Sequence, residues 1–136
     1  MSGPINHFSD LIVYQKAFAL SMRIFELSRN WPAEERYALT NQVRRSSRSV
    51  GANIAEAWAK RLYGAHFVSK LSDSDAELHE TEHWIMCVLK HGYLTHDDFT
   101  SLSAELTEVG KMLGSMIRKP DSFLIKSQRI QTSSDL

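Results

Sequence analysis

Hydrophobic residues recur at three- and four-residue steps in four stretches of the chain, and this spacing predicts four amphipathic helices. The first helix is predicted to begin near Leu11. Its main apolar stripe is formed by Leu11, Tyr14, Phe18, Met22 and Phe25. Further apolar residues widen this stripe beyond one face: Ile12, Val13, Ala19, Leu20 and Ile24. A helix this apolar needs cover on two sides, so we expect its second face to contact either the rest of the monomer or another subunit.

The second predicted helix runs from Pro32 to about Arg61 and holds the main polar pattern of the chain. Proline at a first helical position, followed by glutamates, is typical of a helix start. The inner stripe is formed by Leu39, Val43, Ser46 and Val50. At 100° per residue, three arginines lie on the other side: Arg44, Arg45 and Arg48. Gly51 predicts a bend in this helix.

The third and fourth predicted helices have well-defined stripes. The third is formed by Phe67, Leu71, Ser74, Leu78, Thr81, Ile85 and Val88. The fourth is formed by Phe99, Leu102, Leu106, Val109, Leu113 and Met116. Four helices of about 20 residues with short links predict an all-α fold, an antiparallel up-down four-helix bundle over residues 1–120. Residues 121–136 are predicted to form a mobile C-terminal tail.

Composition and cysteine usage narrow the class of protein. A chain of 136 residues with 43% hydrophobic and 24% charged residues is typical of one soluble globular domain. Lys plus Arg and Asp plus Glu each total 16, so overall charge does not favour nucleic acid or a membrane surface. No apolar run approaches the roughly 18 residues that a membrane span needs. The single Cys87 suits a reducing compartment, and the predicted location is cytoplasmic.

Charge is unevenly distributed along the chain. Residues 1–63 contain nine Lys or Arg and five Asp or Glu, whereas residues 64–110 contain two and nine. A basic second helix thus accompanies an acidic third helix, and two interpretations are open. The helices pair with each other, within one bundle or between subunits, or the arginines form a basic ridge that faces phosphates. Aromatic residues do not interleave with these arginines in the sequence, so stacking of single-stranded bases is not indicated.

One metal-binding motif occurs, since residues 79–83 match the pattern H-E-x-x-H. Its two histidines, His79 and His83, lie about 160° from the centre of the inner stripe, where they face solvent or a neighbouring subunit. Met86 and Leu89 occupy the places where a third ligand would follow. Cys87 lies near the buried side of the third helix, with no nearby histidine in a pattern that suits nucleophilic catalysis, and is predicted to be a small core residue. We therefore predict no metal site, no cofactor, no catalytic residue and no enzymatic activity.

The chain resembles the 23S rRNA-intervening sequence proteins, a family of four-helix bundles, over roughly residues 8 to 118. The segments that carry the resemblance are Phe8, Leu11, Lys16-Ala17, residues 31–36, residues 39–46, residues 49–56, Phe67, residues 70–73, Glu80-Thr81, Trp84 and residues 92–94. The polar residues of this shared pattern are Gln42, Ser49, Asn53, Glu56 and Glu80. Gly51 stands where the family usually has proline, and Ala57 and Ala59 stand where it usually has glycine.

The resemblance implies a ring-like homopentamer without established enzymatic activity. A related group, the accessory variability-determinant proteins of diversity-generating retroelements, binds nucleic acid. We therefore predict a non-enzymatic homo-oligomer, a pentamer by resemblance, that acts as a structural or adaptor protein with no membrane or small-molecule partner. The alternative is an oligomer that binds structured RNA, or DNA, through Arg44, Arg45 and Arg48. Asn53 and Glu56 are expected near the bend or between subunits.

Overall fold

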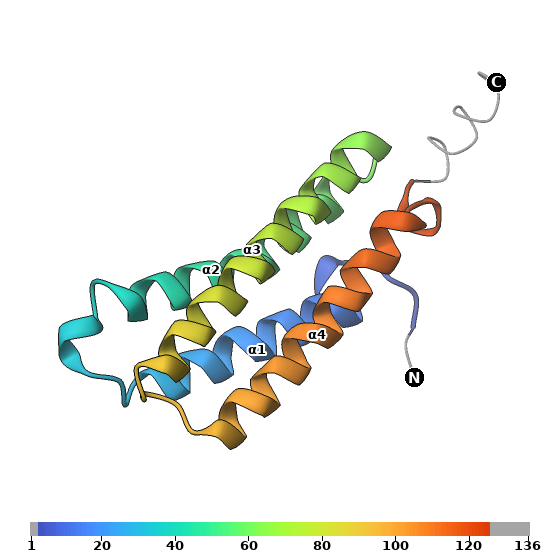
Figure 1. The fold of residues 1–136 in the computed structure, drawn as a ribbon. Coiled ribbons are helices and arrows are strands. Elements are labelled where there is room, and N and C mark those ends of the chain that lie inside the picture. The colour runs from blue at the N-terminus through green and yellow to red at the C-terminus, as the bar shows by residue number, and fades with distance from the viewer. Residues whose placement is uncertain (1–2, 126–136) are drawn as a thin grey trace.

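The structure, a computed structural model, describes residues 3–125 and contains four long helices (Figure 1). These are α1 (Ile12–Ser28), α2 (Leu39–Ala59), α3 (Gly64–Lys90) and α4 (His96–Arg118). Three short 3₁₀ turns accompany them: η1 (Phe8–Asp10), η2 (Ala33–Glu35) and η3 (Asp121–Phe123). Each helix packs antiparallel against its neighbours in sequence, and α4 closes the ring against α1. The predicted all-α, up-down four-helix bundle is confirmed.

The turn between α3 and α4 follows directly from its residues. Gly92 adopts a φ of +82°, a left-handed conformation that costs glycine little, and so ends α3. The amide of Tyr93 then donates a hydrogen bond to the carbonyl oxygen of Val88, at 3.1 Å. Thr95 caps α4 because its hydroxyl oxygen accepts a hydrogen bond from the amide of Asp98. The chain therefore reverses direction within a few residues.

The second helix differs from its prediction at its start. Pro32 precedes the 3₁₀ turn η2, and α2 begins only at Leu39, because the backbone of Ala38 is not helical (φ −125°, ψ −108°). Downstream, α2 continues as one α-helix through Gly51, so the expected bend does not interrupt it. Gly51 is buried, and the ring of Tyr14 on α1 lies 3.6 Å from where a β-carbon would stand. Tyr14 thus packs beside Gly51 at a distance that would leave a β-carbon in ordinary van der Waals contact.

The main apolar stripe predicted for α1 is not the one that faces the core. The core-facing residues are Val13, Ala17, Leu20 and Ile24, all at most 2% exposed. Apart from the buried Leu11, the predicted main stripe lies on the outer side of the helix, where Phe18 is 50% and Met22 is 40% exposed. The phase was ambiguous because both faces of this helix are apolar. The inner stripes of α3 and α4 are confirmed, except that Phe99 is only partly buried.

The packed chain extends beyond the predicted domain boundary at residue 120. The ring of Phe123 in η3 stacks on Phe67, with 6.1 Å between the ring centroids. The amide of Ile125 then donates a hydrogen bond to the carbonyl oxygen of Arg61 at 3.4 Å. The first five residues of the predicted tail therefore belong to the bundle, and residues 126–136 lie outside the described part of the chain. Among residues 3–125, no helix is both long and apolar enough to cross a membrane.

Candidate functional site

The three arginines predicted to form one ridge point to two different sides of α2. Arg45 reaches toward α3, whereas Arg44 and Arg48 reach toward α1. Residues four apart share a helix face and adjacent residues differ by 100°, so this division follows from helix geometry. A single basic surface containing all three arginines is therefore not what the fold presents.

The charge of Arg45 is balanced within the monomer. Its guanidinium lies 3.3 Å from the carboxylate of Glu77 and also pairs with Glu80. Its Nε donates a hydrogen bond to the side-chain oxygen of Gln42 at 3.2 Å. Glu80 in turn accepts a hydrogen bond from the indole N–H of Trp84, at 2.9 Å. This arginine bears out the interpretation that the basic and acidic helices pair within one bundle.

The polar residues of the shared pattern continue this arrangement along α2 and α3. We call the set the polar seam, which comprises Gln42, Arg45, Ser49, Asn53 and Glu56 on α2 and Lys70, Asp73, Glu77 and Glu80 on α3. The Asn53 amide donates to the carbonyl oxygen of Ser49, whose own hydroxyl donates to that of Arg45, both at 2.9 Å. Glu56 lies 3.6 Å from Lys70. The first two contacts lie within α2, whereas the pair of Glu56 and Lys70 joins α2 to α3.

Small buried polar residues hold α2 and α3 close together beneath the polar seam. Ser74 is fully buried, and its hydroxyl donates a hydrogen bond to the carbonyl oxygen of Val50 at 2.8 Å. The hydroxyl oxygens of Thr81 and Ser46, both fully buried, are also 2.8 Å apart. Buried hydroxyls are costly unless paired, and these pairs cross from one helix to the other. They therefore specify how α2 and α3 meet.

On the other side of α2, a cavity of about 420 Å³ lies where α1 ends and α2 begins. We call it the arginine pocket, and its lining residues are Phe25, Ser28, Arg29, Trp31, Pro32, Ala33, Arg36, Thr40 and Arg44. Arg44 is fixed there because its Nε donates a hydrogen bond to the hydroxyl of Ser28 at 2.7 Å. Its guanidinium carbon lies 4.7 Å from the ring centroid of Phe25, and those of Arg29 and Arg48 lie 5.8 and 5.7 Å from it.

The arginine pocket is strongly positive. Partial burial, followed by the charges of Arg48, Arg29 and Arg36, lowers the pKa of the Arg44 guanidinium. None of the lining residues is acidic, and Arg29 finds its carboxylate partner, Glu26, outside the lining. Such a cavity has the chemistry to hold an anion.

Sequence reasoning missed the other residues of this cavity. Arg29, Arg36 and Thr40 lie outside the predicted arginine cluster, and Phe25 comes from a different helix. The aromatic partner that the sequence around the arginines lacks is thus supplied by α1. A usable signal was the pair of arginines that flank Trp31-Pro32, because this turn brings both ends of the segment to one corner.

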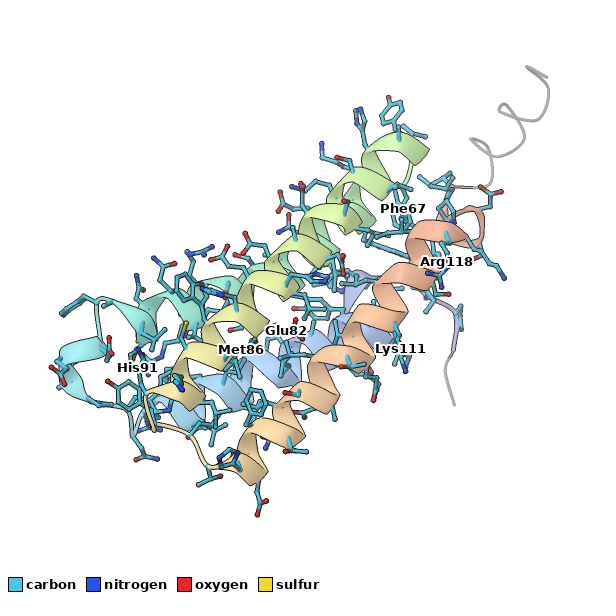
Figure 2. All side chains as sticks on the ribbon, in the orientation of Figure 1. Phe67, Glu82, Met86, His91, Lys111 and Arg118 are labelled. Carbon is cyan, nitrogen blue, oxygen red and sulfur yellow. The ribbon has the colours of Figure 1, made fainter. Side chains whose placement is uncertain are left out.

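The H-E-x-x-H segment lies on the surface of α3. His79 is held by its own helix, with Nδ1 2.8 Å from the carbonyl oxygen of Asp75, and this hydrogen bond, with the nearby acids, raises the pKa of His79. Glu82 and Met86 lie in the space between α3 and α4 (Figure 2). Within residues 3–125, no group of three or more His, Cys, Asp or Glu side chains is arranged to hold a metal ion.

The prediction for Cys87 is confirmed only in part, because the residue packs against the core without being fully buried. The residue is only partly buried, and its sulfur lies 3.9 Å from Nε2 of His83, one turn earlier on α3. Full burial is not reached because α3 buries a narrow stripe, formed at this end by Ile85 and Val88. Cys87 lies beside that stripe, at the edge of the space between α3 and α4.

A second surface is the outer stripe of α1, which is exposed at its centre, at Phe18 and Met22, and contacts α2 at its two ends. We define it as Tyr14, Phe18, Met22 and Phe25, which recur at steps of four, four and three residues. Tyr14 and Phe25 are partly covered, and the rings of Tyr14 and Phe18 lie 6.0 Å apart. The opposite face of the same helix supplies core residues, so α1 is apolar on two sides. Two apolar faces were expected from the sequence, and the stripe predicted as the main one is the outer one.

Comparisons with known proteins agree with this fold. The model of the family described as 23S rRNA-intervening sequence protein matches residues 9–115. The chain is also similar to a crystal structure described as a protein with unknown function from the S23 ribosomal protein family of Bacteroides thetaiotaomicron VPI-5482. The identity is 31% and the TM-score 0.73, and the match covers 79% of this chain and 96% of that one.

A search of curated proteins found no match for this chain. The family match spans all four helices, from η1 to the last turns of α4. It includes both the polar seam and the arginine pocket, so these features lie within the region that defines the family. The chain therefore belongs to the family of 23S rRNA-intervening sequence proteins.

Proposed function

We propose that this protein is a non-enzymatic scaffold that assembles with copies of itself through the outer stripe of α1. The observation that carries the proposal is the exposure of Phe18 and Met22, at 50% and 40%, beside the partly covered Tyr14 and Phe25. A continuous apolar stripe of this kind is unusual on the surface of a monomer. Complete burial of such a side chain from full exposure contributes roughly 1.5–3 kcal/mol, and the part of Phe18 and Met22 that is still exposed would add its share to each contact between subunits.

The expected number of subunits, five, rests on the family resemblance and not on the geometry of the monomer. A closed ring requires each subunit to present two different surfaces, one of which fits the outer stripe of the next subunit. The partner is then the protein itself, in the cytoplasm, and the adaptor role follows from the many equal surfaces that a ring presents. Family membership and the two-sided α1 support this proposal.

A matched pair of substitutions tests the assembly. Met22 lies in the outer stripe, whereas Met86, which is 57% exposed, lies on α3. We expect the wild-type protein to have an oligomeric mass by light scattering at micromolar concentration. Met22→Glu is expected to give monomers, and Met86→Glu to leave the mass unchanged. A monomeric wild-type mass, or equal dissociation by both variants, would contradict the proposal.

A second candidate function is nucleic-acid binding, favoured by the arginines that face α1. Arg36, Arg44 and Arg48 form no ion pair within 4 Å among the described residues. Arginines that are free of carboxylate partners can contact backbone phosphates, and such contacts give affinity without sequence preference. The corresponding ridge is narrower than the predicted one, because Arg45 is already paired.

Charge reversal at Arg48 separates the two candidates. If Arg48 contacts a neighbouring subunit, Arg48→Glu should reduce the oligomeric mass. If it contacts nucleic acid, the mass should stay constant and gel-shift affinity for structured RNA should fall. The slope of log K against log salt should then decrease by about 0.7–0.9 for each phosphate that the variant no longer neutralises. No retardation of RNA or DNA at low salt would end this second candidate.

A further inference from the structure

We propose that the arginine pocket is a binding site for the phosphate group of a small phosphate monoester. The site lies at the corner formed by the end of α1, the turn η2 and the first turn of α2. The inference does not depend on self-assembly, because every residue it uses belongs to one chain. It also differs from the second candidate function, since a small ligand within a cavity needs no extended basic surface.

The first step in the argument is charge. Three guanidinium groups, those of Arg29, Arg44 and Arg48, lie within 5.8 Å of the ring centroid of Phe25, and Arg36 lines the same cavity. Like charges gathered in this way repel one another, and an anion between them would reverse the sign of that interaction. One guanidinium group can donate hydrogen bonds to two oxygens of the same phosphate. Several guanidinium groups in one cavity therefore favour a dianionic phosphate over a singly charged ion.

The acids nearest to this corner do not neutralise it. Glu26 pairs with Arg29 at 3.4 Å, but both side chains are more than 60% exposed, so solvent screens the pair and a ligand could displace it. Glu35 accepts a hydrogen bond from the hydroxyl of Tyr93, at 2.9 Å, on the side of α3 and α4. Glu34 forms no ion pair within residues 3–125 and does not line the cavity.

The second step is an independent observation on Thr40, which lines the pocket. This residue is 96% buried, with 4% of its surface exposed, yet its hydroxyl has no hydrogen-bond partner in the described part of the chain. A buried hydroxyl without a partner costs about 1–3 kcal/mol, and phosphate oxygens are acceptors for it. Thr40 is the second residue of α2, whose start has no side-chain cap, so the positive end of the helix dipole adds to the attraction.

The third step is the shape of the cavity. Its volume of about 420 Å³ falls in the range of about 300–1,000 Å³ found for small-ligand sites. Besides the polar groups, its lining includes Phe25, Trp31 and Pro32, which offer apolar surface. This combination suits a phosphate joined to a small organic group. Free phosphate shares the same chemistry, and experiment distinguishes the two sources.

Calorimetric titration of the full chain in chloride buffer tests the proposal, with inorganic phosphate and glycerol 3-phosphate as the probes. We expect saturable binding at one site per chain. Arg36→Gln should weaken it about ten- to a hundredfold, as expected for loss of a hydrogen bond to a charged group. Arg45→Gln, a matched change on the polar seam, should alter it by less than about twofold. Tighter binding of glycerol 3-phosphate identifies an organic ester as the source, and equal binding identifies free phosphate.

Thr40→Val keeps the test decisive should an arginine variant fold poorly. Because the hydroxyl has no protein partner, this variant should keep the melting temperature of the free protein while weakening phosphate binding several-fold. Circular dichroism verifies the fold of each variant. Absence of saturable binding at millimolar phosphate would overturn the proposal. Equal weakening of phosphate binding by Arg36→Gln and Arg45→Gln would also overturn it. So would a chloride titration that gives the same binding signal as phosphate at the same ionic strength.

Discussion

Arginines lie on two sides of α2, and within residues 3–125 their charge is balanced by carboxylates on one side only. On the side of α3, Arg45 meets Glu77 and Glu80, and its charge is balanced inside the monomer. On the side of α1, Arg44 and Arg48 meet the ring of Phe25 and other arginines. Arg44 and Arg45 are adjacent in sequence, yet only one of them is available to a partner. The difference shows that the face of a helix, and not its net charge, decides which arginines can bind.

The contrast extends to the uncharged residues. Between α2 and α3, hydroxyl groups are buried in pairs, as with Ser74 and the carbonyl oxygen of Val50. On the side of α1, the hydroxyl of Thr40 is buried without a protein partner, and Phe18 is half exposed. One side of α2 is thus internally satisfied, and the other leaves both polar and apolar groups for something outside the monomer. Four predictions test this contrast, in order of decreasing expected effect.

The largest expected effect comes from enlarging a buried serine between α2 and α3. Ser74→Leu adds volume where the helices are closest and removes a hydrogen bond, so the free energy of unfolding should fall by about 2–4 kcal/mol. Urea unfolding followed by circular dichroism measures it. Ser72→Leu, the same change two residues away on the exposed face, should stay within about 0.5 kcal/mol. A similar loss in both variants would show that the contact is not specific.

The next effect tests the close approach of α1 to α2. A β-carbon at position 51 would lie 3.6 Å from the ring of Tyr14, which is ordinary van der Waals contact, and the backbone there is helical. Gly51→Ala should therefore raise the free energy of unfolding by about 1 kcal/mol through helix propensity. Thermal unfolding measures the gain. A lower melting temperature would mean that this face is packed as tightly as the face toward α3.

A smaller effect compares the paired and unpaired arginines. Arg45→Gln should lower the free energy of unfolding by about 0.5–1 kcal/mol, because 43% of the side chain is exposed and solvent screens its ion pairs. Arg48→Gln should change it by less than about 0.5 kcal/mol, since no carboxylate partner is removed from it. The two variants are compared by urea unfolding at low salt. Equal destabilisation would remove the distinction between the two sides of α2.

The smallest effect concerns His79, on the side of α3 that faces away from the polar seam. Its pKa is raised above 6.5 by the hydrogen bond to the Asp75 carbonyl and by the carboxylates of Asp75 and Glu82. A raised folded-state pKa means that its small contribution to stability is present below pH 6.5 and is lost as the pH rises through the raised value. Proton NMR titration measures this pKa, and Asp75→Asn should lower it. A wild-type value at or below 6.5 would contradict the prediction.

Much of the fold could be predicted from the sequence, for physical reasons that differ between helices. The stripes of α3 and α4 were predictable because each helix is apolar on one side only, so periodicity determines the buried face. For α1, periodicity does not determine the buried face, because the stripes that begin at Val13 and Tyr14 are both apolar. The predicted start of α2 was wrong because proline followed by glutamates favours a 3₁₀ turn as well as an α-helix.

The candidate site was predictable only in part. Arg44 and Arg48 were identified from the sequence. They were grouped with Arg45 on the assumption that every residue opposite the inner stripe belongs to one surface. Choosing between faces requires knowing that α3 and α1 lie on different sides of α2, which is tertiary information. The arginine pocket could not be predicted for the same reason, because its lining residues Phe25 and Arg36 come from separate elements. The shared polar pattern was visible in sequence, whereas its role in joining α2 to α3 was not.

The closed ring of helices has a consequence for how the gene could be rearranged. Ile5 and Phe123 line a common cavity of about 310 Å³, so the two ends of the described chain lie at one end of the bundle (Figure 1). The arginine pocket lies at the other end, where the chain has only connections. A short linker could therefore join the chain near Ile5 to the chain near Phe123, and new ends could be opened between α3 and α4 at Gly92. Such a circular permutant would keep every helix contact while carrying its termini beside the pocket, because the order of the helices in space does not depend on where translation begins.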